Sequence, residues 1–191
     1  MIYYKEMDKS CFELYDSVQM NVDIRSEFRI KRIDQGLGGF LFEEVPVRPY
    51  IKDLSVYECA REYEKNFDIS NWRFFMAFDE EKPVGAMTIA GTTNGMNMLN
   101  GATDACVLWD IRVNDEYKHR GIGKKMFQLG IAAAKNDGYR RIFIECQNNN
   151  VTACKFYKKL GAELTKVDMN AYCTEQGLEN EVQFVWTLEI S

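Results

Sequence analysis

The sequence predicts an α/β fold, and the alternation of elements in its second half carries that prediction. Apolar segments typical of strands alternate there with two segments of helical periodicity: a strand at 105–113, a helix at 121–135, a strand at 141–146 and a helix at 151–160. Glycines follow both helices, at Gly138 and Gly161, as expected where a helix ends. A strand–helix–strand order favours a parallel strand pair joined by a right-handed crossover.

The other elements follow from shorter patterns. Strands are predicted at 28–33, 40–45, 72–78, 84–90, 162–172 and 182–189, a short helix at 54–65, turns at 36–39 and 79–83, and a loop at 91–104. Pro46 and Pro49 are expected to end the strand that begins at Phe40. The first 70 residues match no motif, so their role is not predicted.

The bulk composition is that of an ordinary globular protein. The chain has 191 residues and a formal net charge of −5, which argues against a nucleic-acid partner and for a cationic one. No apolar run reaches the roughly 18 residues that a membrane helix needs, and the N-terminus lacks a signal-peptide pattern. We therefore expect a cytoplasmic protein, monomer or homodimer, that binds neither nucleic acid nor a membrane.

The six cysteines and the single histidine, His119, argue against a metal site. No two cysteines form a C-x-x-C pair, and one histidine is too few for a mixed zinc site. Most of the cysteines lie within apolar runs, so we expect reduced thiols in the core.

A basic turn with two glycines follows the strand at 105–113 and opens the next helix. Residues 117–124 read Tyr-Lys-His-Arg-Gly-Ile-Gly-Lys. Unpaired backbone N–H groups at a helix start attract anions, and glycine lets the backbone approach an anion closely. Further donors are the side chains of Lys118, His119, Arg120, Lys124 and Lys125. The turn therefore predicts a site for a phosphorylated ligand.

Two motifs in this half of the chain match a known family. The first is Arg/Gln-x-x-Gly-x-Gly/Ala, which runs from Lys118 to Gly123, with Lys118 in place of Arg or Gln. The second is Asn-x-x-Ala-x-x-Phe-Tyr-x-x-x-Gly, matched by Asn150, Ala153, Phe156, Tyr157 and Gly161. Together they resemble the GNAT superfamily of acetyl-CoA-dependent N-acetyltransferases. Residues 145–157 look most like its streptothricin acetyltransferase branch.

The resemblance implies a mixed, mostly antiparallel twisted sheet whose central parallel strands part to admit coenzyme A, with helices on both sides. It implies one domain over residues 1–191, in which 105–161 form the coenzyme A-binding core. It also implies acetyl-CoA as co-substrate and no metal. The residues expected to contact acetyl-CoA are Ile111, Arg112, Val113, Lys118, His119, Arg120, Gly121, Ile122, Gly123, Lys124, Asn150, Ala153 and Phe156.

Acetyl transfer to an amine requires two proton transfers. The ammonium must lose a proton, which a carboxylate can take, and the departing thiolate benefits from a donor. In the family, a tyrosine at the position of Tyr157 donates to the sulfur, so we expect this role for Tyr157. Asp110 is either the base or a residue that faces the other side of the sheet and satisfies backbone donors.

Other residues could contact the acceptor. Related enzymes often carry a carboxylate where this chain has Trp109, and an aromatic face beside Asp110 would suit a cation. Glu145 is a weaker substrate-site candidate that would act through water. The other acids near expected substrate loops, predicted to be surface charges, are Glu43, Glu44 and Asp104. Asn150 is expected to bond the pantetheine, to cap the helix at 151–160, or both.

Three functions are compatible with these residues. The leading one is acetylation of a small, cationic primary amine, with a streptothricin-like antibiotic as one acceptor. The second is acetylation of a protein or peptide, which needs an open groove beside the loop at 91–104. The third is a non-catalytic acyl-CoA sensor, against which Tyr157 and the intact basic turn argue.

Overall fold

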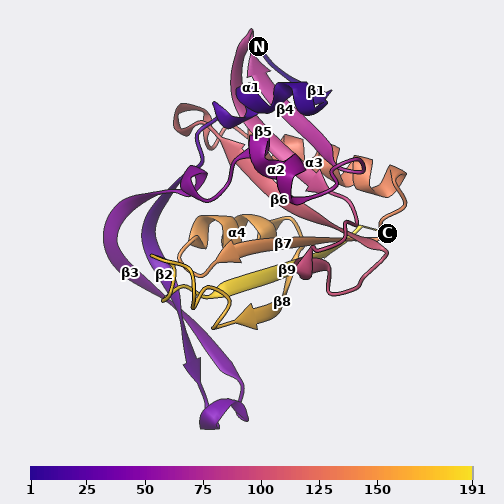
Figure 1. The fold of residues 1–191 in the computed structure, drawn as a ribbon. Helices are drawn as coiled ribbons and strands as arrows, with labels where there is room; N and C mark the ends of the chain where they lie inside the picture. The colour runs from indigo at the N-terminus through magenta and orange to yellow at the C-terminus, as the bar shows by residue number, and fades with distance from the viewer. Residues whose placement is uncertain (191) are drawn as a thin grey trace. The chain divides into compact units, whose positions relative to one another are not determined.

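The computed structural model describes residues 1–190, which divide into two compact units (Figure 1). Unit 1 contains Met1–Asn21, Asp53–Ile144 and the residues from Leu188 onward, and unit 2 contains Val22–Lys52 and Glu145–Thr187. A single domain over the whole chain stays a prediction.

Seven strands form one sheet in the order β1-β4-β5-β6-β7-β9-β8, and β2 and β3 form a separate two-stranded sheet. The strands are β1 (Ile2–Met7), β2 (Asn21–Arg32), β3 (Phe40–Asp53), β4 (Arg73–Asp79), β5 (Lys82–Ala90), β6 (Ala105–Val113), β7 (Arg141–Gln147), β8 (Glu163–Asp168) and β9 (Gln183–Glu189). The pairs β1–β4, β4–β5, β5–β6 and β8–β9 are antiparallel. Strands β6 and β7 are parallel, from Ala105 opposite Arg141 to Leu108 opposite Ile144. The predicted mixed, mostly antiparallel sheet with a parallel pair is confirmed.

The helices of unit 1 cover opposite faces of its strands. The α-helices of the chain are α1 (Phe12–Asp16), α2 (Tyr63–Asn66), α3 (Ile122–Asn136) and α4 (Val151–Lys159). On β5, a Cβ at Gly85 would lie 3.0 Å from Met126 Cε of α3. The neighbouring Ala86 instead belongs to a buried cluster with Phe12 and Tyr15 of α1. Alternate residues of β5 therefore face α3 and α1.

A β-bulge interrupts this alternation on β6. Leu108 pairs with Ile89 and Asp110 pairs with Thr88, so Trp109 is the extra residue. A bulge of this kind places consecutive side chains on one face. Trp109 packs against the same buried cluster that contains Tyr15, and Asp110 accepts a hydrogen bond from Tyr15. Both side chains thus face the α1 side of the sheet.

Unit 2 packs the β2–β3 hairpin against β9 and the start of α4. The rings of Phe28 and Phe42 lie 6.2 and 5.7 Å from the ring of Phe184. The backbone N–H of Phe28 donates to the carbonyl of Asn148 at 2.9 Å. These ring contacts bury part of the apolar face of the hairpin.

The single helix predicted at 54–65 is wrong. The segment forms two short 3₁₀ turns, Leu54–Val56 and Ala60–Glu62, and then α2. The backbone is extended at Cys59, and the carboxylate of Asp16 accepts hydrogen bonds from the N–H groups of Ala60 and Arg61. A tertiary contact replaces the hydrogen bonds of a continuous helix.

The predicted end of the strand at residue 45 is also wrong, because β3 continues past Pro46 and Pro49 to Asp53. In a two-stranded sheet each strand has one open edge, where a proline removes no ladder hydrogen bond. Strand β1 and helix α1 lie where no element was predicted.

The elements from residue 72 onward agree with the predictions to within a few residues, except that β8 ends at Asp168. All six cysteines are free thiols, and four of them are buried. Within residues 1–190, no helix has both the length and the apolar character needed to cross a membrane.

Candidate active site

The turn before α3 presents uncapped backbone N–H groups. Gly121 is the N-cap, with φ of +82°, and a Cβ there would meet no atom within 4 Å. Its conformation, not crowding, favours glycine. No side chain caps the helix, and its first turn contains no acidic residue. The positive end of the helix dipole is therefore available to an anion.

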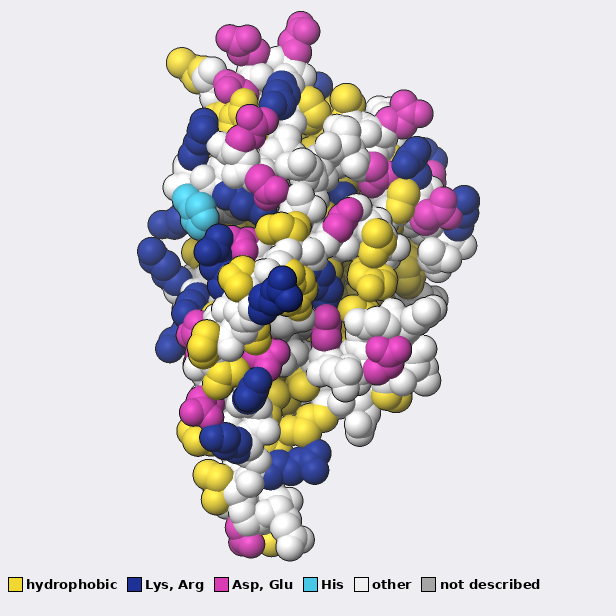
Figure 2. Space-filling view, turned by 90° about the vertical axis from the view of Figure 1, so that its left-hand side faces the viewer, with side chains coloured by type: hydrophobic (Ala, Val, Ile, Leu, Met, Phe, Trp, Pro, Cys, Tyr) yellow, Lys and Arg dark blue, Asp and Glu magenta, His cyan; other side chains and the backbone are white. Residues whose placement is uncertain are grey.

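The side chains of this turn differ in their contacts. Lys118 Nζ donates to Asn21 O and to Asp115 Oδ1, both at 2.6 Å, so it holds the turn in place. The Arg120 guanidinium lies 4.8 Å from the ring centre of Tyr117. His119 is exposed, with φ of +61°. In Figure 2, Lys and Arg side chains gather near the single histidine.

Helix α4 of unit 2 carries the second predicted group. Asn150 Oδ1 accepts a hydrogen bond from Ala153 N at 3.2 Å, which confirms Asn150 as the N-cap. Tyr157 is buried, and its ring centre lies 5.5 Å from that of Phe156. The contacts of Asn150 and Phe156 with pantetheine stay predictions, as does proton donation by Tyr157.

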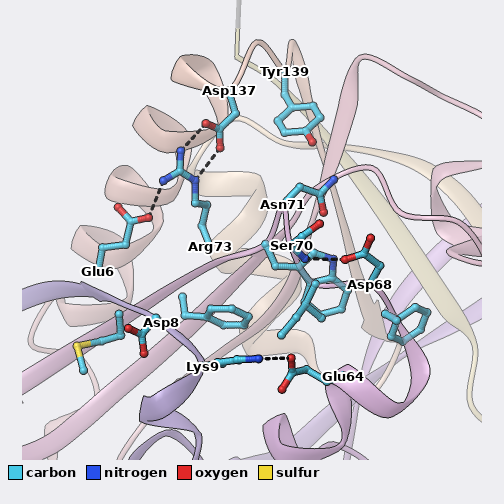
Figure 3. Close-up of a pocket in the computed structure, with 15 residues that line it drawn as sticks. Glu6, Asp8, Lys9, Glu64, Asp68, Ser70, Asn71, Arg73, Asp137 and Tyr139 are labelled. Carbon is cyan, nitrogen blue, oxygen red and sulfur yellow. Dashed lines mark hydrogen bonds and ion pairs between the residues drawn. The ribbon is translucent and has the colours of Figure 1, made fainter.

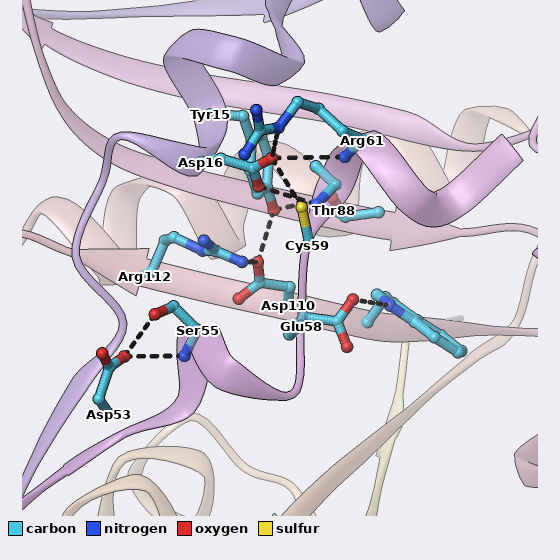
Figure 4. A network of polar contacts seen from close by, with 12 residues as sticks. Tyr15, Asp16, Asp53, Ser55, Glu58, Cys59, Arg61, Thr88, Asp110 and Arg112 are labelled. Carbon is cyan, nitrogen blue, oxygen red and sulfur yellow. Dashed lines mark hydrogen bonds and ion pairs between the residues drawn. The ribbon is translucent and has the colours of Figure 1, made fainter. Parts of the chain in front are cut away.

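Asp110 belongs to a buried ion pair (Figure 4). Its Oδ2 accepts from Arg112 Nε at 2.8 Å, from Arg112 Nη2, and from the Tyr15 hydroxyl at 3.0 Å. The Tyr15 hydroxyl also bonds Thr88. Of the two roles expected for Asp110, this geometry favours the one in which its carboxylate accepts hydrogen bonds from neighbouring donors. Those donors are side chains, not backbone groups, and the bulge keeps Asp110 on the face of Trp109.

The same contacts place the side chain of Arg112 in the core, where only its backbone could serve the predicted contact with pantetheine. Its backbone lies opposite Ala86, between Ile111 opposite Met87 and Val113 opposite Gly85. Pantetheine binding along these three residues stays a prediction.

Trp109 lies within an aromatic cluster on the α1 side of the sheet. Its ring centre is 5.1 Å from Phe67, 5.2 Å from Trp72 and 6.3 Å from Tyr63. The indole Nε1–H donates to Glu58 Oε1 at 2.9 Å. The structure thus places a carboxylate beside the predicted cation-binding ring.

Glu58 was missed by the sequence analysis. It lies in the segment just before the 3₁₀ turn Ala60–Glu62, where no motif or periodicity marks it. Burial raises the pKa of Glu58 above its ordinary value of 4.5, the hydrogen bond from Trp109 lowers it, and the charge of Asp110 raises it. Glu58 and Trp109 are 51 residues apart in the sequence, and tertiary packing brings them together.

Glu145, the other predicted acid of the site, belongs to unit 2. The Tyr172 hydroxyl donates to Glu145 Oε1. Burial raises the pKa of Glu145 to about 7, while the hydroxyl and the charge of Lys52 lower it. Its contact with an acceptor stays a prediction.

The other acids considered are engaged in ion pairs at the surface. Glu43 pairs with Lys31, Glu44 with Lys155, and Asp104 with Arg141. All three carboxylates are more than a third exposed, as expected for surface charges.

A hollow of about 970 Å³ lies on unit 1 next to the aromatic cluster (Figure 3). Phe67 and Trp72 of the cluster form part of its wall. Arg73 bridges Glu6 and Asp137 there, and Lys9 pairs with Glu64. The charged groups of this hollow are thus largely paired with one another.

Residues 42–162 match the model of the acetyltransferase (GNAT) family. The chain belongs to this family. This acetyltransferase is 25% identical over 163 residues to the streptothricin acetyltransferase of Escherichia coli. The aligned residues span 85% of this chain and 82% of that one. It is 26% identical over 112 residues to streptothricin acetyltransferase A of Bacillus subtilis (strain 168), 59% of each chain.

Solved structures agree on the fold. A nourseothricin acetyltransferase superposes with a TM-score of 0.78 at 20% identity, over 100% of this chain and 99% of that one. A putative streptothricin acetyltransferase from Bacillus anthracis, in complex with acetyl coenzyme A, gives 0.77 at 21% identity over 99% of each chain. The enzyme is an acyl-CoA-dependent N-acetyltransferase.

The basic turn fits the pyrophosphate of such a donor. The uncapped start of α3 supplies N–H groups, and Lys124 and Lys125 are exposed at its first turn. The chemistry of these donors matches a diphosphate.

Proposed function

We propose that this acetyltransferase transfers the acetyl group of acetyl-CoA to a primary amine of a small cationic molecule, by direct attack within a ternary complex. The observation that supports the acceptor class most is the pair of Trp109 and Glu58 in the aromatic cluster. An indole face and a carboxylate together favour an ammonium group.

The proposal assigns the donor to two sets of residues. The turn from Lys118 to Lys124 would hold the pyrophosphate by backbone N–H groups and lysine side chains. The backbone of Ile111, Arg112 and Val113 would pair with the pantetheine arm as an added strand does. Asn150, Ala153 and Phe156 would line that arm from α4.

The reaction needs a neutral amine and a protonated leaving group. A primary amine with a pKa of roughly 10.4 is about one part in a thousand neutral near pH 7.4, a deficit of about 4 kcal/mol. A carboxylate can take the excess proton. The amine nitrogen then attacks the thioester carbonyl, the C–S bond breaks, and the Tyr157 hydroxyl donates its proton to the departing sulfur. The proton that nitrogen loses as the amide forms restores the Tyr157 hydroxyl.

The likeness to streptothricin acetyltransferases makes streptothricin the first acceptor to test. CoA release is followed with acetyl-CoA and streptothricin, spermidine, an aminoglycoside, lysine or a lysine-terminated peptide. We expect release with at least one of the small cationic amines at a higher kcat/KM than with the peptide. A preference for the peptide would support a protein or peptide acetyltransferase. Binding of acetyl-CoA without release for any amine would support a sensor.

A further inference from the structure

We infer that Glu58 binds the ammonium group of the acceptor and takes its proton, so that Glu58, not Asp110, is the base. This inference rests on the proposed function, because it assumes an amine acceptor at the Trp109 side of the sheet.

The surroundings of the Glu58 carboxylate suit a base. Oε1 is held by the Trp109 indole at 2.9 Å, and the Tyr63 hydroxyl also lies close enough to the carboxylate to lower its pKa. The side chain is half-buried, so the carboxylate has a set position without being fully enclosed. A base needs this combination of a set position and access to the proton that it takes.

The charge of Glu58 also favours this role. The charged and titratable groups that act on the pKa of Glu58 are Tyr63 of α2 and Asp110 and Arg112 of β6. Arg112 is committed to Asp110 in the buried ion pair. Among the ion pairs formed by residues 1–190, none includes Glu58. Glu58 thus carries a negative charge that an acceptor cation would neutralise.

Buried polar atoms on the groups that act on Glu58 also favour a ligand at this place. Tyr63 Oη, Asp110 Oδ1 and Arg112 Nη1 have no hydrogen-bond partner within residues 1–190. All three residues are 3% exposed. Tyr63 Oη nonetheless lies close enough to Glu58 to lower the pKa of that carboxyl. Buried polar atoms without partners are rare and costly in structural regions, and are more common where a ligand binds.

Asp110 is a poorer base on the same grounds. Its carboxylate is fully buried, and Oδ2 already accepts three hydrogen bonds from Arg112 and Tyr15. Protonation of Asp110 would weaken this ion pair each time the enzyme turned over. Glu58 loses no ion pair on protonation, and burial already raises its pKa toward the working pH.

The step balances without another reactant. The ammonium N–H bond breaks, its electron pair stays on nitrogen, and the proton passes to the Glu58 carboxylate. The neutral amine then attacks the acetyl carbonyl and the C–S bond breaks. The second nitrogen proton, released as the amide forms, replaces the one that Tyr157 gives to the departing sulfur. After the product leaves, Glu58 returns the proton to solvent through its exposed side.

The test is the pH dependence of kcat/KM with streptothricin, or with whichever small amine the wild-type enzyme acetylates best, between pH 6 and pH 10. Glu58→Gln keeps an oxygen that can accept from Trp109 but removes the base. We expect a loss of about 100-fold or more at pH 7. The rate of the variant should then rise about ten-fold per pH unit, as the neutral amine becomes available, and approach wild type near the amine pKa.

Two variants control the result. Glu62→Gln removes an exposed acid of the same segment, one that pairs with Lys65, and should match wild type at every pH. Glu58→Asp keeps a carboxylate, so its rate should be lower than wild type without the ten-fold rise per pH unit.

Acetyl-CoA binding by calorimetry and urea unfolding at pH 8 establish that each variant is folded. A wild-type enzyme that releases CoA, together with Glu58→Gln at wild-type rates across the range, would overturn the role of Glu58 alone. The same rise with pH in Glu58→Asp and Glu58→Gln would also overturn it. A wild-type enzyme that acetylates no amine overturns the proposed function and, with it, this inference.

Discussion

Asp110 and Glu58 are two acids on the same side of the sheet with opposite surroundings. Asp110 is enclosed and paired with a guanidinium, whereas Glu58 is half-exposed and held by a neutral indole. A buried carboxylate with a cationic partner contributes chiefly to the integrity of the fold, since removal of one partner leaves a buried charge. A half-buried carboxylate without such a partner is available for proton transfer.

This contrast predicts a stability effect for Asp110. Asp110→Asn leaves the Arg112 guanidinium buried without an anion, so the free energy of unfolding should fall by about 3–5 kcal/mol. Urea denaturation at pH 7 measures it. Asp104→Asn breaks an ion pair in which the Asp104 side chain is 42% and the Arg141 side chain 34% exposed. Its loss should cost less than about 1 kcal/mol. Equal losses in the two variants would contradict the structural role of Asp110.

Tyr157 predicts an effect on chemistry alone. Tyr157→Phe keeps the ring packed beside Phe156 but removes the proton donor to sulfur. We expect kcat to fall at least about ten-fold, as for the loss of a general acid. The dissociation constant of acetyl-CoA, measured by calorimetry, should change little. Unchanged turnover would remove Tyr157 from the mechanism.

Glu145 predicts a pH-dependent stability. Its folded-state pKa is raised, so its contribution to stability is fully present below its ordinary pKa and is lost as pH rises through about 7. Relative to wild type, Glu145→Gln should therefore gain stability between pH 4.5 and pH 8, by up to roughly 3 kcal/mol. Chemical denaturation at both pH values measures it, and a gain equal at both would refute the assignment.

At the scale of elements, long periodic segments could be predicted and contact-dependent ones could not. Helices α3 and α4 and strands β4 to β7 carry their own pattern, so their bounds agree with the sequence. The segment at 54–65 takes its shape from Asp16, and the position of Trp109 depends on a bulge that no local signal marks. Glu58 was missed for the same reason.

The two ends of helix α3 predict opposite responses to a charge reversal. Lys124→Glu places an acid in the first turn, where the helix dipole stabilises it by about 0.3–1 kcal/mol. The new carboxylate, however, repels a diphosphate. We expect KM for acetyl-CoA to rise at least about ten-fold, equal to about 1.4 kcal/mol, with no loss of stability. Lys135→Glu makes the same change in the last turn and should leave KM unchanged.

If both variants raised KM equally, net charge would explain the effect and the α3 N-terminus would not be the phosphate site. Steady-state kinetics at two salt concentrations separate these cases, because a long-range effect is screened by salt.

At the scale of the whole molecule, the proposal draws on residues of both units. The basic turn and the Trp109–Glu58 pair belong to unit 1, and Asn150 and Tyr157 belong to unit 2. The donor-binding residues lie in motifs and could be predicted from the sequence. The acceptor residues come from the loops and short helices of the first half, where tertiary contacts decide the structure.

The most direct test of the acceptor site is a crystal structure of the enzyme with CoA and streptothricin. We expect an ammonium nitrogen of the antibiotic within hydrogen-bond distance of Glu58 and in contact with the Trp109 ring. An antibiotic whose ammonium groups all lie elsewhere, for example in the hollow lined by Asp8, Glu64 and Asp68, would contradict it.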